Sequence, residues 1–92
     1  MTENKFSDNA DESRYELNID GKIVFADYRR QNGKVFIDHV EAPQELRGTG
    51  AAGKLMHSIM GDIQAKNMKA VPICGYAASW LRKHNEYSAA LG

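Results

Sequence analysis

The sequence predicts a single α+β domain in which an antiparallel β meander precedes a helix, a strand and a second helix, in the order β-β-β-α-β-α. Residues 14–40 alternate apolar and polar positions and contain two hairpin-type dipeptides, which is typical of antiparallel strands. The second half has two segments with apolar residues at helical spacing, and a glycine-rich stretch opens the first of them. The whole chain has 92 residues, so there is room for one hydrophobic core.

The boundaries of the meander strands are predicted from two turn-forming dipeptides. Asp20-Gly21 and Asn32-Gly33 tolerate the positive φ angles that two-residue hairpin turns require. They divide the segment into three expected strands, Arg14–Ile19, Lys22–Arg30 and Lys34–Val40. The third strand ends before Pro43, because proline cannot continue a hydrogen-bonded ladder.

A long amphipathic helix is expected from the glycine-rich stretch to about Lys66. Its spacing of three and four residues predicts one buried face, formed by Ala52, Leu55, Met56, Ile59, Met60 and Ile63.

The chain is expected to continue with a short strand and a second helix. The strand spans residues 69–74, and Pro72 favours an edge position for it. The helix spans residues 76–84 and turns Ala77, Trp80 and Leu81 inward. A short helical or frayed tail, residues 88–92, follows.

Composition excludes several classes of function. Lys plus Arg equals Asp plus Glu, for a formal net charge of zero, which argues against a nucleic-acid or membrane-surface binder. The lone Cys74 cannot form an internal disulfide, so a reducing, cytoplasmic location is expected. Met1–Ser13 is polar and acidic, lacks the apolar core of a signal peptide, and is expected to be a mobile tail outside the domain at residues 14–92.

The glycine-rich stretch Gly48-Thr49-Gly50-Ala51-Ala52-Gly53-Lys54 indicates a phosphate site, because glycines admit a ligand to backbone N–H groups at a helix start. The spacing of its glycines and lysine matches two nucleotide-binding motifs, the P-loop and the dinucleotide-binding fingerprint, but the surrounding sequence lacks other residues that each motif requires. A P-loop requires Ser or Thr where Leu55 stands. A dinucleotide site requires the glycines directly after a strand and an acidic end to the next strand, and here Pro43 and Cys74 intervene. A nucleotide phosphate binder remains an alternative.

The combination of a meander, a proline-containing loop and Arg47-Gly48-Thr49-Gly50-Ala51-Ala52 before a long helix resembles the coenzyme A site of the GNAT acetyltransferases. Glu45 departs from the Gln or Arg usual at the first position of that pattern. The segments Asp38–Pro43, Pro72–Tyr76 and His84–Tyr87 are similar to the minimal, single-domain branch of that superfamily. The resemblance covers residues 14–91.

This resemblance implies that the chain binds acetyl-CoA. It implies that pantetheine pairs with strand backbone at His39, Val40 and Glu41, and that an N–H near Val40 holds the thioester carbonyl. Lys83 and His84 are expected near the adenine-side phosphate. The pyrophosphate is expected on backbone N–H groups of the residues that follow Leu46, namely Arg47, Gly48, Thr49, Gly50, Ala51, Ala52 and Gly53.

Three residues are candidates for catalysis. Cys74 reads from sequence alone as a small buried hydrophobe, whereas the resemblance implies an acetyl acceptor. His39 shares its strand face with Val35 and Ile37, and is either a half-buried histidine or a general base. Tyr76 is either a core residue or the acid that protonates the leaving thiolate. No metal ligand set is expected.

The resulting hypothesis is an acetyl-CoA-dependent N-acetyltransferase acting on a small-molecule or protein amine, by direct attack or through an acetyl-cysteine. The alternative is a coenzyme A or acyl-CoA-binding module without turnover. The chain is expected to be a monomer or a weak homodimer, with neither nucleic acid nor membrane as a partner.

Overall fold

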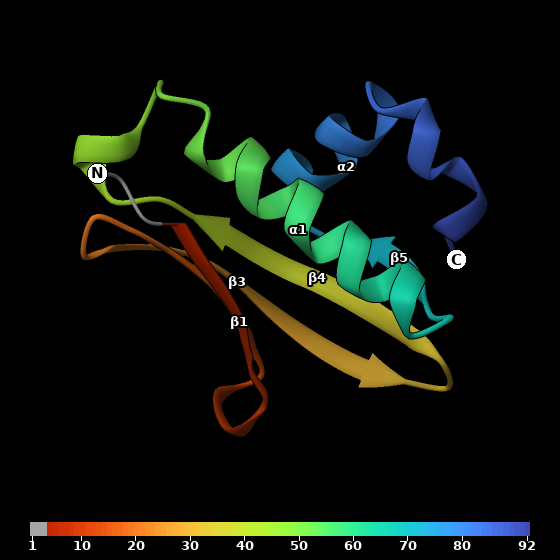
Figure 1. Cartoon of the computed structure of the whole chain (residues 1–92). Helices are drawn as coiled ribbons and strands as arrows, with labels where there is room; N and C mark the ends of the chain where they lie inside the picture. Colours follow the sequence, from red (N-terminus) through yellow and green to blue (C-terminus); the bar gives the residue numbers. More distant parts are fainter. Residues whose placement is uncertain (1–3) are drawn as a thin grey trace.

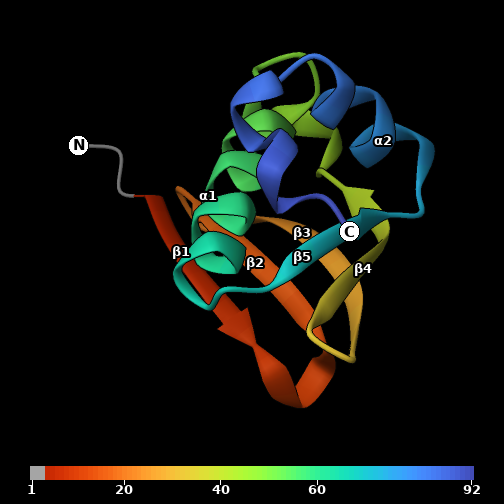
Figure 2. The same ribbon diagram turned by 90° about the vertical axis from the view of Figure 1, so that its right-hand side faces the viewer.

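A computed structural model describes residues 4–92 as one five-stranded sheet with its helices on one face (Figure 1). The strands lie in the order β1-β2-β3-β4-β5. The view in Figure 2 also places α1, α2 and the C-terminal turn on the same side of the sheet. The elements are β1 (Asn4–Asn9), β2 (Arg14–Ile19), β3 (Lys22–Gln31), β4 (Lys34–Glu41), α1 (Ala51–Ala65), β5 (Lys69–Pro72) and α2 (Gly75–Arg82), with 3₁₀ turns at Ala10–Glu12, Gln44–Leu46 and Asn85–Ala90.

The predicted meander is confirmed, strand by strand and turn by turn. β2, β3 and β4 pair antiparallel in sequence order. Asp20 and Gly21 have φ angles of 51° and 82°, and Asn32 and Gly33 have 54° and 76°, which is the backbone of the expected hairpin turns. Among residues 4–92, no helix is both long and apolar enough to cross a bilayer.

The expected mobile tail is wrong for residues 4–13. Asn4–Asn9 forms β1 and pairs antiparallel with β2 along its whole length, so the sheet has one more strand than the sequence predicted. Phe6 stacks on Tyr15 with their ring centroids 5.6 Å apart. The first three residues of the expected tail lie outside the described part of the chain.

A polar network fastens β1 to the rest of the domain. Asp8 accepts hydrogen bonds from Tyr28 (2.5 Å), Arg30 (2.6 Å) and Lys66 (3.3 Å). Burial alone would raise the pKa of the Asp8 carboxyl, but these hydrogen bonds outweigh it and hold the pKa below its usual 3.8. Burial and the bond to Asp8 raise the pKa of Tyr28 to about 12. The strand is therefore held by charge-assisted bonds as well as by its ladder.

The core lies between α1 and the concave side of β2, β3 and β4. The predicted buried face of α1 is confirmed from Leu55 to Ile63. Its first fully buried residue is Ala51 rather than the predicted Ala52. The predicted inward residues of α2, Ala77, Trp80 and Leu81, are buried as well.

β4 and β5 run parallel and separate partway along. Their register runs from Lys34 opposite Lys69 to Ile37 opposite Pro72, and the Ile37 carbonyl then accepts the N–H groups of Ile73 (2.9 Å) and Cys74 (3.2 Å). The expected strand at residues 69–74 therefore ends at Pro72, at the sheet edge, as a proline there favours. β4 continues to Glu41 without β5 beside it.

Replacing Asp8 with alanine should lower the free energy of unfolding by about 1–3 kcal/mol at neutral pH, because three donors lose their acceptor. A carboxyl whose pKa is lowered by folding stabilises the protein above its unfolded pKa and loses that effect as the pH falls. The difference between the unaltered protein and Asp8→Ala should thus shrink below about pH 4. Urea denaturation followed by circular dichroism at several pH values measures it.

The matched control is Asp11→Ala, since Asp11 is exposed in the turn after β1. It should unfold like the unaltered protein at every pH. An Asp8→Ala deficit that persists undiminished in strong acid would contradict the assigned role of the carboxylate.

Candidate functional site

The glycine-rich stretch forms a loop with two backbone turns that favour glycine. Gly48 and Gly50 have φ angles of 81° and 84°, in the left-handed region that glycine adopts without strain. Gly50 is the N-cap of α1. The 3₁₀ turn Gln44–Leu46 separates β4 from the glycines, so they do not follow a strand directly as a dinucleotide site requires.

Backbone donors cluster at this loop. The N–H groups of Leu46, Arg47 and Thr49 close local turns, and that of Lys54 makes the first helical bond, to Gly50. Within residues 4–92, five further N–H groups have no protein acceptor; they belong to Gly48, Gly50, Ala51, Ala52 and Gly53. Free N–H groups at a helix start, together with the helix dipole, attract anions.

The local charges also suit an anion. No side chain caps α1, and its first turn holds no acidic residue. Arg47 is exposed, with its Nε donating to the Ala42 carbonyl at 3.3 Å. Glu45, the departure from the family pattern, is exposed on the 3₁₀ turn and does not line the adjoining pocket. Its carboxylate is thus absent from the pocket wall.

A pocket of about 230 Å³ adjoins the loop. Of the residues expected to bind a cofactor, Thr49, Val40, Glu41 and Lys83 do not line it. Sequence reasoning missed two apolar lining residues, Ala42 and Leu46, whose only signal was their position on either side of Pro43. The lining residues are Ala42, Leu46, Arg47, Gly48, Gly50, Ala51, Ala52, Gly53 and Tyr76.

Tyr76 reaches this pocket from α2. It is 43% exposed, and its hydroxyl lies 4.0 Å from the point where a Cβ on Gly53 would stand. Burial, with a smaller contribution from Cys74, raises the pKa of the phenol. Tyr76 is therefore not a core residue, and its hydroxyl stays protonated at neutral pH.

Cys74 lies where β4 and β5 separate, at the N-cap of α2. Its sulfur accepts the N–H of Ala77 at 3.3 Å, and the residue is partly buried against the core. Its side chain does not line the glycine-loop pocket. The thiol thus has a structural role as a cap, which neither interpretation of the sequence anticipated.

His39 does not face the side of the sheet that the sequence predicted. The pairing of β3 with β4 shifts by one residue between Asp27 and Tyr28, and Asp38 is the extra residue on β4. Such a bulge reverses the alternation beyond it, so Val40 packs on the core and His39 does not. The His39 side chain is 54% exposed, with its Nε2 3.8 Å from a Glu41 oxygen and its ring 6.3 Å from that of Phe25.

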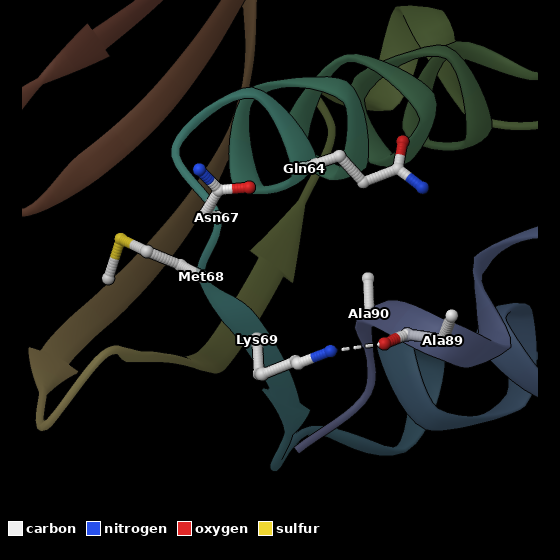
Figure 3. A pocket seen from close by; sticks show the side chains of 6 residues that line it. All are labelled: Gln64, Asn67, Met68, Lys69, Ala89 and Ala90. Carbon is white, nitrogen blue, oxygen red and sulfur yellow. Dashed lines mark hydrogen bonds between the residues drawn. The ribbon is translucent and has the colours of Figure 1, made fainter.

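A second pocket, of about 200 Å³, lies near the opposite end of α1. Figure 3 shows its one cationic side chain, Lys69, directed at the Ala89 carbonyl, to which it donates a hydrogen bond. Its amine is thus already engaged. The lining consists of Gln64, Asn67, Met68, Lys69, Ala89 and Ala90, and we assign it no function.

The capping role of Cys74 can be measured by comparing two substitutions. Serine supplies an oxygen acceptor at the same position and alanine supplies none, so Cys74→Ser should be more stable than Cys74→Ala by about 1 kcal/mol. Thermal and urea denaturation of both variants tests this. Equal stabilities would mean that the contact with the Ala77 N–H contributes nothing.

Comparison with known proteins agrees with this geometry. Residues 14–91 match the family model of the GCN5-related N-acetyltransferases. A solution structure from Staphylococcus aureus, described as a candidate GCN5-like N-acetyltransferase, superposes with a TM-score of 0.75 at 23% identity. The match covers 96% of this chain and 87% of that one. No curated protein matches the chain.

The structural match establishes the fold, with the predicted helix–strand–helix after the meander. The family match spans nearly all of it, including the glycine loop, Cys74 and α2. This chain therefore belongs to the GCN5-related N-acetyltransferase family, and it is an acyltransferase.

Proposed function

We propose that the protein transfers the acetyl group of acetyl-CoA to an amine, by way of a thioester on Cys74. The observation that carries the proposal is the uncapped start of α1, with its free N–H groups and an adjoining pocket, beside the point where β4 and β5 separate. A ligand with a phosphate at one end and a thioester at the other would place its phosphate on the N–H groups of α1 and its thioester where β4 and β5 separate.

The glycine loop fits the pyrophosphate of coenzyme A. Five N–H groups there have no acceptor within residues 4–92, and no carboxylate lines the pocket. The positive φ angles of Gly48 and Gly50 turn the backbone without placing a side chain over it. Arg47 adds positive charge at the rim. We propose that Arg47 to Gly53 hold the pyrophosphate.

The remaining contacts follow from the shape of the sheet. β4 extends beyond the end of β5, so we propose that the backbone at Val40 and Glu41 pairs with the pantetheine arm. An N–H near Val40 would hold the thioester carbonyl, and one such donor typically lowers the barrier by about 3 kcal/mol. Lys83, exposed at the end of α2, is proposed to approach the adenine-side phosphate.

Bound acetyl-CoA supplies an activated acetyl group as a thioester. Cys74 is proposed to accept it: its sulfur forms the new bond to the carbonyl carbon, while the bond to the coenzyme sulfur breaks. The Ala77 N–H donates a hydrogen bond to this sulfur at 3.3 Å, and the sulfur stands at the N-terminus of α2. Tyr76, whose raised pKa keeps it protonated, can donate a proton toward the departing thiolate.

In the second step the amine nitrogen forms a bond to the acetyl carbonyl carbon, the bond from that carbon to the Cys74 sulfur breaks, and the amine loses a proton. His39 is the proposed base that takes this proton, because the free nitrogen of a neutral imidazole is a proton acceptor. It lies on β4 one residue before Val40, on the exposed face of the sheet, with Glu41 3.8 Å away. Because β4 has, within residues 4–92, no neighbouring strand on the β5 side beyond Ile37, we propose that the amine reaches the thioester at this free edge of β4. The substrate class is thus an amine on a small molecule or on an exposed protein segment.

Incubation of the native protein with acetyl-CoA should add one acetyl group to Cys74, visible by intact mass and removed by hydroxylamine. Cys74→Ser should bind coenzyme A with unchanged affinity by calorimetry and should not form a hydroxylamine-labile adduct. The serine variant is the suitable one because it keeps the cap on α2.

Other outcomes discriminate among the alternatives. Full activity in Cys74→Ser would replace the thioester route with direct attack by the amine. Coenzyme A binding without turnover on a broad panel of amines would favour a non-catalytic binding module. Binding of Mg-ATP with no binding of coenzyme A would overturn the proposal.

His39→Gln should lower kcat by about 10²-fold, the typical contribution of a general base, with coenzyme A affinity unchanged. His57→Gln is the matched control, because His57 lies on α1 and contacts α2 and Tyr87 rather than β4. Steady-state assays of both variants with the best acceptor make the comparison. A His39→Gln enzyme with normal kcat would remove His39 from the mechanism.

A further inference from the structure

α1 and α2 come close together at Gly53, which lines the glycine-loop pocket. A Cβ built on Gly53 would stand 3.3 Å from the indole nitrogen of Trp80 and 4.0 Å from the Tyr76 hydroxyl. A side chain at residue 53 would therefore press on the indole nitrogen and stand in ordinary van der Waals contact with the Tyr76 hydroxyl. Glycine leaves two side-chain donors on α2 open toward the first turn of α1.

The indole N–H of Trp80 has no protein acceptor within residues 4–92. The residue is only 8% exposed, and an unpaired polar group in such a position is costly. Every fully enclosed side-chain nitrogen or oxygen in the described chain has a partner, so this nitrogen must keep a small accessible surface. This nitrogen is the nearest atom to the position of a Cβ on Gly53. Gly53 lines the pocket and Trp80 itself does not, so the indole stands directly behind the pocket wall at Gly53.

The indole ring is held in place from several sides. His84 stacks on it at 3.7 Å between centroids with an interplanar angle of 12°. His57 meets it edge-on at 4.7 Å, and Tyr87 lies at 5.8 Å. The donor is therefore fixed before any ligand arrives, so little conformational entropy is lost when it binds.

We propose that the Trp80 indole N–H donates a hydrogen bond to the pyrophosphate of bound coenzyme A, across the gap left by Gly53. This inference rests on the proposed function and adds a donor from α2 to the N–H groups of α1. An anion held at the first turn of α1 meets the Gly53 N–H on one side and the indole N–H on the other.

Trp80→Phe keeps an aromatic ring under His84 and removes the donor. Calorimetric titration should show coenzyme A bound about tenfold or more weakly than by the unaltered protein, which is what a hydrogen bond to a charged group typically contributes. Pantetheine, which has no phosphate, should bind equally well to both. The control Tyr87→Phe, which loses only a hydroxyl at 2.8 Å from His57, should not weaken coenzyme A binding.

A second pair of variants keeps Trp80 intact. Gly53→Ala places a methyl group 3.3 Å from the indole nitrogen, whereas Gly61→Ala on the same helix meets open space. Gly61→Ala should be at least as stable as the unaltered protein, because alanine is the better helix former, whereas in Gly53→Ala the same gain is opposed by the contact with the indole. Gly53→Ala alone should bind coenzyme A more weakly. If Trp80→Phe does not fold, this pair decides the question.

Unchanged coenzyme A affinity in Trp80→Phe, or in Gly53→Ala relative to Gly61→Ala, would overturn the inference. An equal loss for pantetheine would also overturn it, since the indole would then act on another part of the ligand. Failure of the unaltered protein to bind coenzyme A would overturn the proposed function as well, and so is distinguishable from failure of the Trp80 contact alone.

Discussion

The carbonyl of Ile37 is the last point at which β4 and β5 are joined, and the site depends on it. It accepts two N–H groups from the chain that leaves β5, those of Ile73 and Cys74. Pro72 has no N–H with which to extend the ladder. One residue further along β4, the bulge at Asp38 redirects the strand. The free stretch of β4, the position of Cys74 and the outward direction of His39 all follow from this junction.

The glycines at the start of α1 are poor helix formers, and they leave its backbone N–H groups accessible to a ligand. An oxygen-bearing N-cap is favoured over glycine by only a few tenths of a kcal/mol, and the intrinsic helix propensity of alanine exceeds that of glycine by about 1 kcal/mol. The chain has glycine at both positions. The buried face from Leu55 onward holds the helix against the sheet instead. Packing of Ala51 and of the buried face beyond it thus stabilises α1, and the N–H groups of its first turn stay open to a ligand.

Features set by neighbouring residues could be predicted from the sequence, and features set by distant contacts could not. The two hairpin turns follow from Asp20-Gly21 and Asn32-Gly33, and the buried face of α1 follows from its spacing. β1 was missed because Phe6 is its only large apolar residue, so alternation gave no signal. Its anchor, Asp8, depends on partners up to 58 positions away. His39 was misplaced because a single-residue bulge leaves no signature in an alternating pattern. Its role, and those of Lys83 and Cys74, stay predictions.

The anchoring of β1 also bears on the order in which the domain can assemble during synthesis. β1 and β2 are close in sequence and can pair as soon as both have left the ribosome. The bond from Lys66 to Asp8 spans 58 positions, so it forms only after α1 has been made. Contacts at such separation require a long loop to close, which costs conformational entropy and slows folding. In a nascent chain Asp8 therefore lacks one of its partners until most of the domain has emerged. Only when Lys66, at the C-terminal end of α1, has been made can the last of the hydrogen bonds that anchor β1 form.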